Sequence, residues 1–434
     1  MIFKKLMRFV IFNNNNKVVV YMKVTVLLLI FIYVFVVTIS HKVVNKKLIE
    51  TSSATNGLKS DDSKNDPKLN QNIYDLNDVN DYKVVTPIID LKSDNQINED
   101  FQFLDNFEDK NRVIRYGGYS GHTMKIAITV CGNQTLQQSL VTLKSAALLT
   151  ESRLHFIIMT DEDNRQIIRQ FLLTEWPKHI LSRISFEIHL VSFPNTLNAE
   201  EWRKLFKLCA AQRLFLPTIL KDIDSVLYVD TDVLFLTPID QIWTLFQSMN
   251  SSQMAAMSPE SEDFASSWYH RFAKHPYVER LGVNSGVMLM NLTRMRTFGW
   301  TDYLEPYLSL YKHNIVWGDQ DIINIIFHYN SDKLYIFTCD WNYRPDHCIY
   351  TRVCKPAEQT GVRIIHGNRG VFLNEKQPSF RAIYESFKDF SFNNDLSVLL
   401  DVIKTQLENS SNTNCGKARH SFTLALEAFL SNQH

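Results

Sequence analysis

Two aspartates in the run YVDTDVLFL, residues 228–236, are the most distinctive chemical feature of the chain. Asp230 and Asp232 interrupt an otherwise apolar segment at the point where a buried strand should end. Two carboxylates so close together and partly removed from water need a counter-ion, or one of them must bind a proton. A divalent cation shared with a substrate diphosphate would remove that cost, and oxygen ligands suit Mg²⁺ or Mn²⁺. The alternative is a strand-end turn with two solvated aspartates.

A histidine far downstream, His366, also ends an apolar run, VRII, and is followed by Gly367. A lone strand-end histidine more often packs or caps than binds a metal. A shell of carboxylates and imidazole, however, would favour Mn²⁺ over Mg²⁺. Arg369 and Lys376 follow, and both could meet phosphate oxygens, Arg through its planar fork and Lys as a point charge. The alternative is a basic surface loop.

Three further segments place polar residues where ligands commonly bind. Arg213 is on an expected helix, CAAQRLFLP, that leads into the Asp230 strand. An expected apolar strand at 283–291 contains Asn284, Ser285 and Gly286. Glycine weakens strand pairing but lets a ligand approach the backbone, a strand bulge being the alternative. The segment GDQDIIN starts an expected helix with Asp319 and Gln320, although aspartate is also a routine helix cap.

The elements that would position these residues alternate between strands and helices. The apolar runs KIAITVC and LHFIIMT predict strands buried on both faces, whereas the alternating segment 184–190 predicts a half-buried strand. Strands are also expected at 225–230, 283–291, 334–338 and 362–366. Helices are expected at about 136–147, 210–220 and 239–246, and another after Asp161 and Asp163, which can cap it. This order predicts an α/β fold with a mainly parallel sheet and helices on both faces. Ligands of such sheets collect at the carboxyl ends of the strands.

The composition excludes several classes of protein. The 434 residues include 46 basic and 46 acidic side chains, so the formal charge is zero, which argues against a nucleic-acid partner. Only 13 glycines and 12 prolines exclude collagen-like and proline-rich fibres, and 45% hydrophobic residues suffice for a large core.

The N-terminal third differs from the rest. Residues 18–39 are almost purely apolar and predict a transmembrane signal anchor, after a basic cytoplasmic tail at 1–17. A cleaved signal peptide is the alternative, but no small-residue cleavage site follows the apolar run. Residues 40–120 are rich in Asp, Asn, Ser and Lys and predict a disordered lumenal stem. The catalytic domain is then expected at 121–390, with a polar tail of no assigned role at 391–434.

Six cysteines and four glycosylation sequons fit a single-pass type II protein of the Golgi or endoplasmic reticulum membrane, with its catalytic domain in the lumen. Six cysteines allow 15 pairings. We expect Cys348 to pair with Cys354, which closes a short loop, and the lack of a CxxC argues against structural zinc. The sequons are Asn133, Asn250, Asn291 and Asn409.

Taken in order, the motifs resemble the glycosyltransferase family 8 pattern. They are AAQRLFLP, LYVDTDVLFL, VNSGVMLMN, WGDQDIIN and IIHGNRG, and the resemblance covers roughly 125–385. It implies a Rossmann-like nucleotide-sugar-binding domain of the GT-A type, with a mainly parallel mixed sheet, preceded here by a single transmembrane helix. Longer stretches, such as EEWRKLFKLCAAQRLFLP and CDWNYRPDHCIY, resemble xylose-transferring members more narrowly.

The resemblance also implies roles for the site residues. Asp230, Asp232 and His366 would bind Mn²⁺, or Mg²⁺, together with the diphosphate of UDP, and Gln320 would face the anomeric carbon of the donor. The donor sugar would be held by Arg213, Asn284 and Asp319, and the uracil and ribose would lie near Val130, Cys131 and Asn133. The remaining donor-binding residues would be Thr231, Ser285, Gly286, Gly367 and Lys376. One departure from the family is Phe372, where much of the family has a lysine; here the lysine is Lys376.

The function so implied is retaining transfer of α-linked xylose from UDP-xylose to O-linked glucose on epidermal-growth-factor-like repeats of Notch-type proteins. The alternatives are a family member with a glucose or galactose donor, a phosphohydrolase of the haloacid-dehalogenase type, and a lumenal glycan-binding protein without activity. Trp317, Trp341 and Tyr343 could stack on an acceptor sugar, or could pack in the core.

Overall fold

The computed structural model describes residues 113–118, 123–193, 200, 202, 206 and 209–432. The expected anchor at 18–39 and most of the expected stem lie outside these residues. No helix within the described part is both long enough and apolar enough to cross a membrane.

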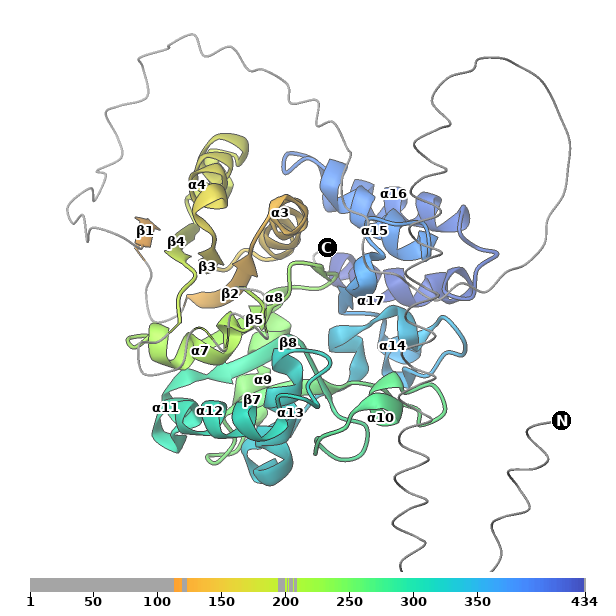
Figure 1. Cartoon of the computed structure of the whole chain (residues 1–434). Coiled ribbons are helices and arrows are strands. Elements are labelled where there is room, and N and C mark those ends of the chain that lie inside the picture. Colours follow the sequence, from red (N-terminus) through yellow and green to blue (C-terminus); the bar gives the residue numbers. More distant parts are fainter. Residues whose placement is uncertain are drawn as a thin grey trace, which may run out of the picture. The chain divides into compact units, whose positions relative to one another are not determined.

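An eight-stranded sheet with the order β1-β4-β3-β2-β5-β8-β7-β9 is the centre of the fold (Figure 1). Its strands are β1 (Val113–Tyr116), β2 (Met124–Val130), β3 (Leu154–Thr160), β4 (Ile184–Leu190), β5 (Ser225–Val229), β7 (Ala255–Pro259), β8 (Val283–Asn291) and β9 (Leu334–Ile336). Four neighbouring pairs are parallel, and three are antiparallel. The predicted mixed, mainly parallel sheet is therefore confirmed.

Helices cover both faces of this sheet, because its central strands are apolar on both sides. In β2, Ile126 and Ile128 pack in one core cluster with α3, α4 and α15, whereas Ala127 packs in the other with α7, α11, α12 and α13. The helices are α3 (Asn133–Leu148), α4 (Glu162–Glu175), α5 (Lys178–Leu181), α7 (Gln212–Ile219), α8 (Ile239–Trp243), α9 (Leu245–Ser248), α10 (Trp268–Phe272), α11 (Leu292–Phe298), α12 (Trp300–Tyr311), α13 (Asp319–Tyr329), α14 (Lys355–Thr360), α15 (Pro378–Asp389), α16 (Leu396–Glu408) and α17 (Arg419–Ser431).

A second, two-stranded sheet joins distant parts of the chain. Strand β6 (Val233–Phe235) pairs antiparallel with β10 (Ile364–His366), so that His366 lies opposite Val233. The short 3-10 helix η3 (Cys339–Asn342) contacts β10. This pairing brings the end of the predicted strand 362–366 beside the residues that follow the predicted strand 225–230, over 100 residues away in sequence.

The structure differs from the expected domain boundaries at both ends. Strand β1 lies within the segment expected as stem, and it pairs with β4 as an edge strand. Beyond residue 390, helices α16 and α17 bury Leu399 and Phe422 in the main core cluster. The segment expected as a polar tail is therefore part of the folded domain, because its apolar residues recur at helical spacing.

All six cysteines form disulfides, and the expected Cys348–Cys354 pair is wrong. The pairs are Cys131–Cys209, Cys339–Cys354 and Cys348–Cys415. Closeness in sequence misled the expectation, because α17 and the loop before it return to the segment that contains Cys348. The pairing depends on tertiary packing, which the sequence spacing does not reveal.

Strand β4 is buried on both faces, not half-buried as predicted. Its polar residues Ser185, Glu187 and His189 are each under one tenth exposed. The Glu187 carboxylate lies 3.2 Å from His189 Nε2, 3.7 Å from His155 Nε2 and 3.5 Å from Arg115 Nε on the edge strand β1. Removing a carboxylate from water costs free energy, and here the surrounding positively charged or polar partners offset that cost.

We expect Glu187→Gln to destabilise the fold. Burial alone would raise the pKa of Glu187, but its interactions with His155 and His189 outweigh burial and hold that pKa well below its usual range. A lowered pKa means that this carboxylate stabilises the fold above its unfolded pKa of about 4.3, and that this contribution is lost as the pH falls further. Urea unfolding at pH 7 should show a loss of about 1–3 kcal/mol, which shrinks below about pH 4.

The control for this change is Glu375→Gln, since that side chain is 90% exposed. It removes the same charge and should leave the free energy of unfolding unchanged. Equal stability of the Glu187→Gln variant and the wild type at pH 7 would contradict the role assigned to this cluster.

Candidate active site

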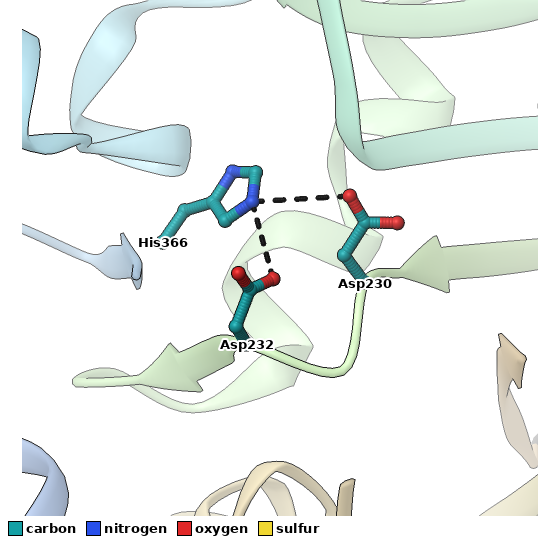
Figure 2. A group of neighbouring side chains, drawn as sticks. All are labelled: Asp230, Asp232 and His366. Atoms are coloured by element: carbon teal, nitrogen blue, oxygen red, sulfur yellow. Dashed lines mark ion pairs between the residues drawn. The ribbon is translucent and has the colours of Figure 1, made fainter. Parts of the chain in front are cut away.

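The three predicted metal ligands converge, although they come from two separate segments (Figure 2). Nε2 of His366 lies 3.3 Å from Asp232 Oδ1 and 3.8 Å from Asp230 Oδ2. One ligand atom from each residue lies within 4.8 Å of the others. The histidine is almost fully buried and both aspartates are partly exposed, so the cluster opens toward solvent on the carboxylate side.

The backbone around the two aspartates is held in place by its neighbours. β5 ends at Val229, and the Asp230 N–H donates to Gly286 O of the adjacent strand β8 at 2.9 Å. The Thr142 hydroxyl on α3 donates to the Thr231 carbonyl at 2.7 Å, and the Gly367 N–H donates to the Asp232 carbonyl at 2.7 Å. The turn between β5 and β6 therefore aims both carboxylates at His366.

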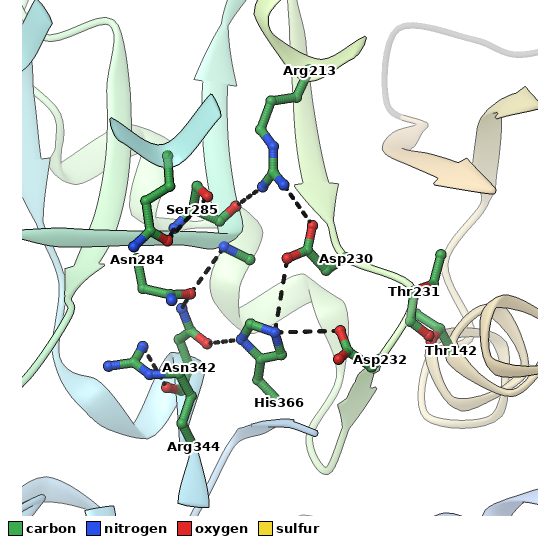
Figure 3. A network of polar contacts seen from close by, with 12 residues as sticks. Thr142, Arg213, Asp230, Thr231, Asp232, Asn284, Ser285, Asn342, Arg344 and His366 are labelled. Atoms are coloured by element: carbon green, nitrogen blue, oxygen red, sulfur yellow. Dashed lines mark hydrogen bonds and ion pairs between the residues drawn. The ribbon is translucent and has the colours of Figure 1, made fainter. Parts of the chain in front are cut away.

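A chain of amides sets which nitrogen of His366 carries a proton (Figure 3). The Gly286 N–H can only donate, and it donates to Asn284 Oδ1, which also accepts from Asn342 Nδ2 at 2.8 Å. Asn342 Oδ1 must then accept from His366 Nδ1 at 2.9 Å. Nε2 is therefore the nitrogen that faces the aspartates, and its lone pair is available to a cation.

This donor set fits a divalent cation. Two carboxylate oxygens and one imidazole nitrogen are present, and the histidine is oriented by a neighbouring amide, as in many metal sites. Burial alone would raise the pKa of Asp232, but the charge and hydrogen bond of His366 outweigh it and lower that pKa. Asp232 can therefore act as an anionic ligand at neutral pH.

We expect Asn342→Ala to weaken cation binding without removing a ligand. Without the Asn342 carboxamide, His366 Nδ1 loses its acceptor and the ring is no longer held toward the aspartates. The Mn²⁺ concentration for half-maximal activity should rise about 10–100-fold. Thermal unfolding without metal reports the accompanying loss of stability. An unchanged Mn²⁺ dependence would show that the amide chain does not orient the histidine.

Arg213 links the cation site to α13. Its guanidinium pairs with Asp230 Oδ1 at 2.9 Å and with Asp319, and it donates to the Ser285 carbonyl. It also lies over the Tyr228 ring, 4.5 Å from the centroid. Burial raises the pKa of Asp319 to about 6; nearby Asp230 adds to the rise, and Arg213 opposes it.

Both polar atoms of the Gln320 carboxamide are hydrogen-bonded. Its Oε1 accepts from the Ser285 N–H at 3.1 Å, and its Nε2 donates to Glu260 Oε2 at 3.1 Å. The same Glu260 oxygen accepts from Asn284 Nδ2 at 2.7 Å. Gln320, Asn284 and the amide chain to His366 therefore form one continuous network of hydrogen bonds.

Sequence reasoning missed two members of this network, Glu260 and Asn342. Glu260 directly follows strand β7, so the rule that ligands gather at strand ends could have found it. Asn342 is in the 3-10 helix η3, and no local signal distinguishes it from other buried asparagines.

Comparison with known proteins identifies the family. The model of the family described as "Glycosyl transferase family 8" matches residues 88–368. The chain belongs to glycosyl transferase family 8. It is therefore a glycosyltransferase, and its GT-A-like α/β fold agrees with the family. This assignment excludes the alternative of a haloacid-dehalogenase-type phosphohydrolase.

Two curated relatives within the family are similar over most of their length. Glucoside xylosyltransferase 1 of Danio rerio is 48% identical over 316 residues, which cover 70% of this chain and 77% of that protein. Glucoside xylosyltransferase 1 of Homo sapiens is 47% identical over 308 residues, 68% of each chain. A crystal structure of mouse xyloside xylosyltransferase 1 in its apo form matches at 21% identity and a TM-score of 0.43, covering 57% of this chain and 98% of that one.

The residues expected near the nucleotide of this family 8 transferase lie at the end of β2. That strand is parallel to β5 and adjacent to it. Val130 ends β2 and Cys131 follows it, next to the strand that precedes Asp230. Cys131 is bonded to Cys209, which ties this end of the sheet to the start of α7, the helix of Arg213. Asn133 is exposed and begins α3. Their contacts to uracil and ribose stay predictions.

The basic residues after His366 are less closely tied to the site. Arg369 pairs with Asp346 at 2.6 Å, and Lys376 lies exposed in the turn before α15, its N–H donating to Asn374. Phe372, at the position where much of family 8 has lysine, is fully buried, and its ring packs directly against Gly367. A phosphate contact by Lys376 stays a prediction.

The three aromatic residues considered for stacking on an acceptor sugar differ in their burial. Trp341 and Tyr343 are buried in the main core cluster, as the alternative interpretation had it. Trp317, by contrast, is only partly buried and directly precedes Gly318, the residue before α13 of the transferase. Its ring packs on Tyr269 of α10 at 4.8 Å.

Proposed function

We propose that this family 8 glycosyltransferase moves α-linked xylose from UDP-xylose to glucose that is O-linked to epidermal-growth-factor-like repeats of Notch-type proteins, with retention of configuration. The observation that carries the proposal is the 48% identity to a glucoside xylosyltransferase across most of both chains. The convergence of Asp230, Asp232 and His366 next to Asp319 and Gln320 supports it, because a nucleotide-sugar transferase needs diphosphate and sugar sites side by side.

In this proposal, each part of the network has a distinct task. Asp230, Asp232 and His366 would hold a divalent cation, which when bound would neutralise charge on the leaving diphosphate. Arg213 pairs with both Asp230 and Asp319, so its positive charge offsets the repulsion between the two carboxylates and holds both in place. Asp319 and Asn284 would hold the donor sugar by hydrogen bonds to its hydroxyls.

Gln320 is the residue next to the reacting carbon in this assignment. An amide is a poor nucleophile, so a covalent intermediate on it is unfavourable. Glu260 binds the amide nitrogen of Gln320 and the Ser285 N–H binds its oxygen, so the amide is a fixed dipole. Such a dipole can stabilise positive charge that develops on the sugar. The acceptor hydroxyl would attack from the face that the diphosphate leaves, with the diphosphate oxygen taking its proton.

We further propose Mn²⁺ as the preferred cation, since an imidazole ligand suits Mn²⁺ better than Mg²⁺. We also propose a lumenal location in the Golgi or endoplasmic reticulum, anchored by residues 18–39 as a type II protein. Three disulfides that use every cysteine support an oxidising compartment.

The decisive experiment is a screen of UDP-sugars with Mn²⁺, using a glucosylated and an unglucosylated repeat as acceptors. We expect xylose transfer to the glucosylated repeat alone, and loss of activity on chelation that Mn²⁺ restores better than Mg²⁺. Faster transfer from UDP-glucose or UDP-galactose would contradict the donor assignment. Equal transfer to the unglucosylated repeat would contradict the acceptor assignment.

A further inference from the structure

Two large aromatic side chains are exposed together on α10, Trp268 and Phe272, and we call them the aromatic ridge. They are 42% and 47% exposed, respectively. Trp268 and Phe272 are one helical turn apart, and their rings stack at 5.4 Å. Among the other exposed hydrophobic side chains, Ile167 on α4 and Leu310 on α12 are single residues, whereas Val398 and Val402 on α16 are a smaller, aliphatic pair. A contiguous exposed apolar group is typical of an interaction surface.

The ridge is held rigidly by contacts on its own element. The Ser267 hydroxyl caps α10 by accepting from the His270 N–H at 3.2 Å, and His270 Nδ1 bonds the Tyr277 hydroxyl at 2.7 Å. Arg271 donates to the Ala265 carbonyl, and its guanidinium lies over the Trp268 ring at 5.5 Å. A preordered aromatic pair loses little conformational entropy on binding, so the ridge suits recognition of a partner.

The other side of α10 is attached to the start of α13, the helix that carries Asp319 and Gln320. Tyr269 is buried, and its hydroxyl donates to Asp321 Oδ1 at 2.8 Å. The second Asp321 oxygen accepts the N–H groups of Val316 and Trp317 at 2.7 and 2.8 Å. Val316 is itself 58% exposed. Helix α10, which carries the ridge, is therefore joined through Tyr269 and Asp321 to the start of α13, where Asp319 and Gln320 lie.

We propose that the aromatic ridge binds the polypeptide part of the acceptor, next to the residue that carries the glucose. This inference rests on the proposed function, in which a protein-linked glucose must reach the donor beside Gln320. The glucose itself would occupy the space at Gln320, and α10 is the helix attached to this end of α13, so it is placed to contact the polypeptide that carries the glucose. Exposed Trp and Phe pairs are also the side chains that dominate binding energy at protein interfaces.

The test compares a glucosylated repeat with phenyl β-glucoside, an acceptor that has no polypeptide. For Trp268→Ala and Phe272→Ser, the KM for the glucosylated repeat should rise at least about tenfold, which is about 1.4 kcal/mol. The KM for UDP-xylose and the kcat/KM for phenyl β-glucoside should stay within about twofold of wild type. Ile167→Ala removes an equally exposed side chain on α4, and it should leave the kinetic constants for both acceptors unchanged.

A direct binding measurement separates this inference from the proposed function. Calorimetry of the glucosylated repeat with the whole chain should show weaker binding for both ridge variants, whether or not xylose is transferred. Normal binding and turnover of the repeat by the variants, or an equal loss with both acceptors, would overturn the inference. A change in oligomeric state without a change in repeat binding would overturn it too, because the ridge would then contact a second copy. Transfer of no xylose by the wild type, with ridge-dependent binding intact, would instead overturn the proposed function.

Discussion

Asp232→Asn should lower the rate of sugar transfer by about 10³-fold while leaving the fold intact. Asp232 contributes one of the two carboxylates in the cation site, and Nε2 of His366 lies 3.3 Å from its Oδ1. Asp230 is a less clean choice, because it also pairs with Arg213 and its loss would disturb the donor-sugar side of the site. The amide of asparagine keeps the shape of the side chain but removes the charge that a divalent cation requires.

The measurement is steady-state transfer across a range of Mn²⁺ concentrations, together with thermal unfolding in the presence of UDP. Mn²⁺ and UDP together should raise the Tm of the wild type but not that of the variant, because a ligand stabilises only the form that binds it. The matched control is Asp222→Asn, an exposed aspartate before the other end of β5. Wild-type turnover and Mn²⁺ dependence in Asp232→Asn would exclude this site as the place where the cation binds.

Gly286→Ala should cost about 10²-fold in activity, although it adds a single methyl group. A Cβ at position 286 would lie 2.2 Å from His366 Cε1 and 2.6 Å from Nδ1, far inside van der Waals contact. The strand cannot retreat easily, because Gly286 accepts from the Asp230 N–H at 2.9 Å and donates to Asn284 Oδ1 at 3.0 Å. The imidazole must therefore move away from the two aspartates.

The expected signature is a higher Mn²⁺ requirement together with a modest loss of stability, about 1–3 kcal/mol for overpacking. Gly118→Ala is the control, since no atom lies within 4 Å of its added Cβ. The effect at position 286 is steric, because the backbone there is not in the left-handed region that favours glycine. Full activity at an unchanged Mn²⁺ concentration would mean that the imidazole can bind the cation from a different position.

Local sequence patterns were sufficient to predict most of the strands and helices. The runs before Val130, Thr160 and Val229 predicted buried strands correctly, because an apolar run of that length has few other stable solutions than a strand covered on both faces. The same reasoning failed for β4, where Glu187 and its neighbours read as solvent-facing. Their burial depends on His155 from β3 and Arg115 from β1, which no local pattern of β4 contains.

The residue types of the candidate site were also evident from the sequence. Asp230 and Asp232 stood out because charges inside an apolar run are costly unless something binds them. His366 was named as their partner, and the structure brings it within 3.8 Å of both. Its place depends on the pairing of β10 with β6, a contact between segments that a single sequence does not specify.

The sequence by itself determined which residues can carry the chemistry, the alternation of strands and helices, and the resemblance to a transferase family. Only the tertiary structure decided which nitrogen of His366 faces the aspartates, that Asn342 and Glu260 join the network, and which cysteines pair. The physical reason is the range of the interactions. Hydrophobic periodicity acts between neighbours in sequence, whereas hydrogen-bond polarity and disulfide pairing arise where distant segments meet.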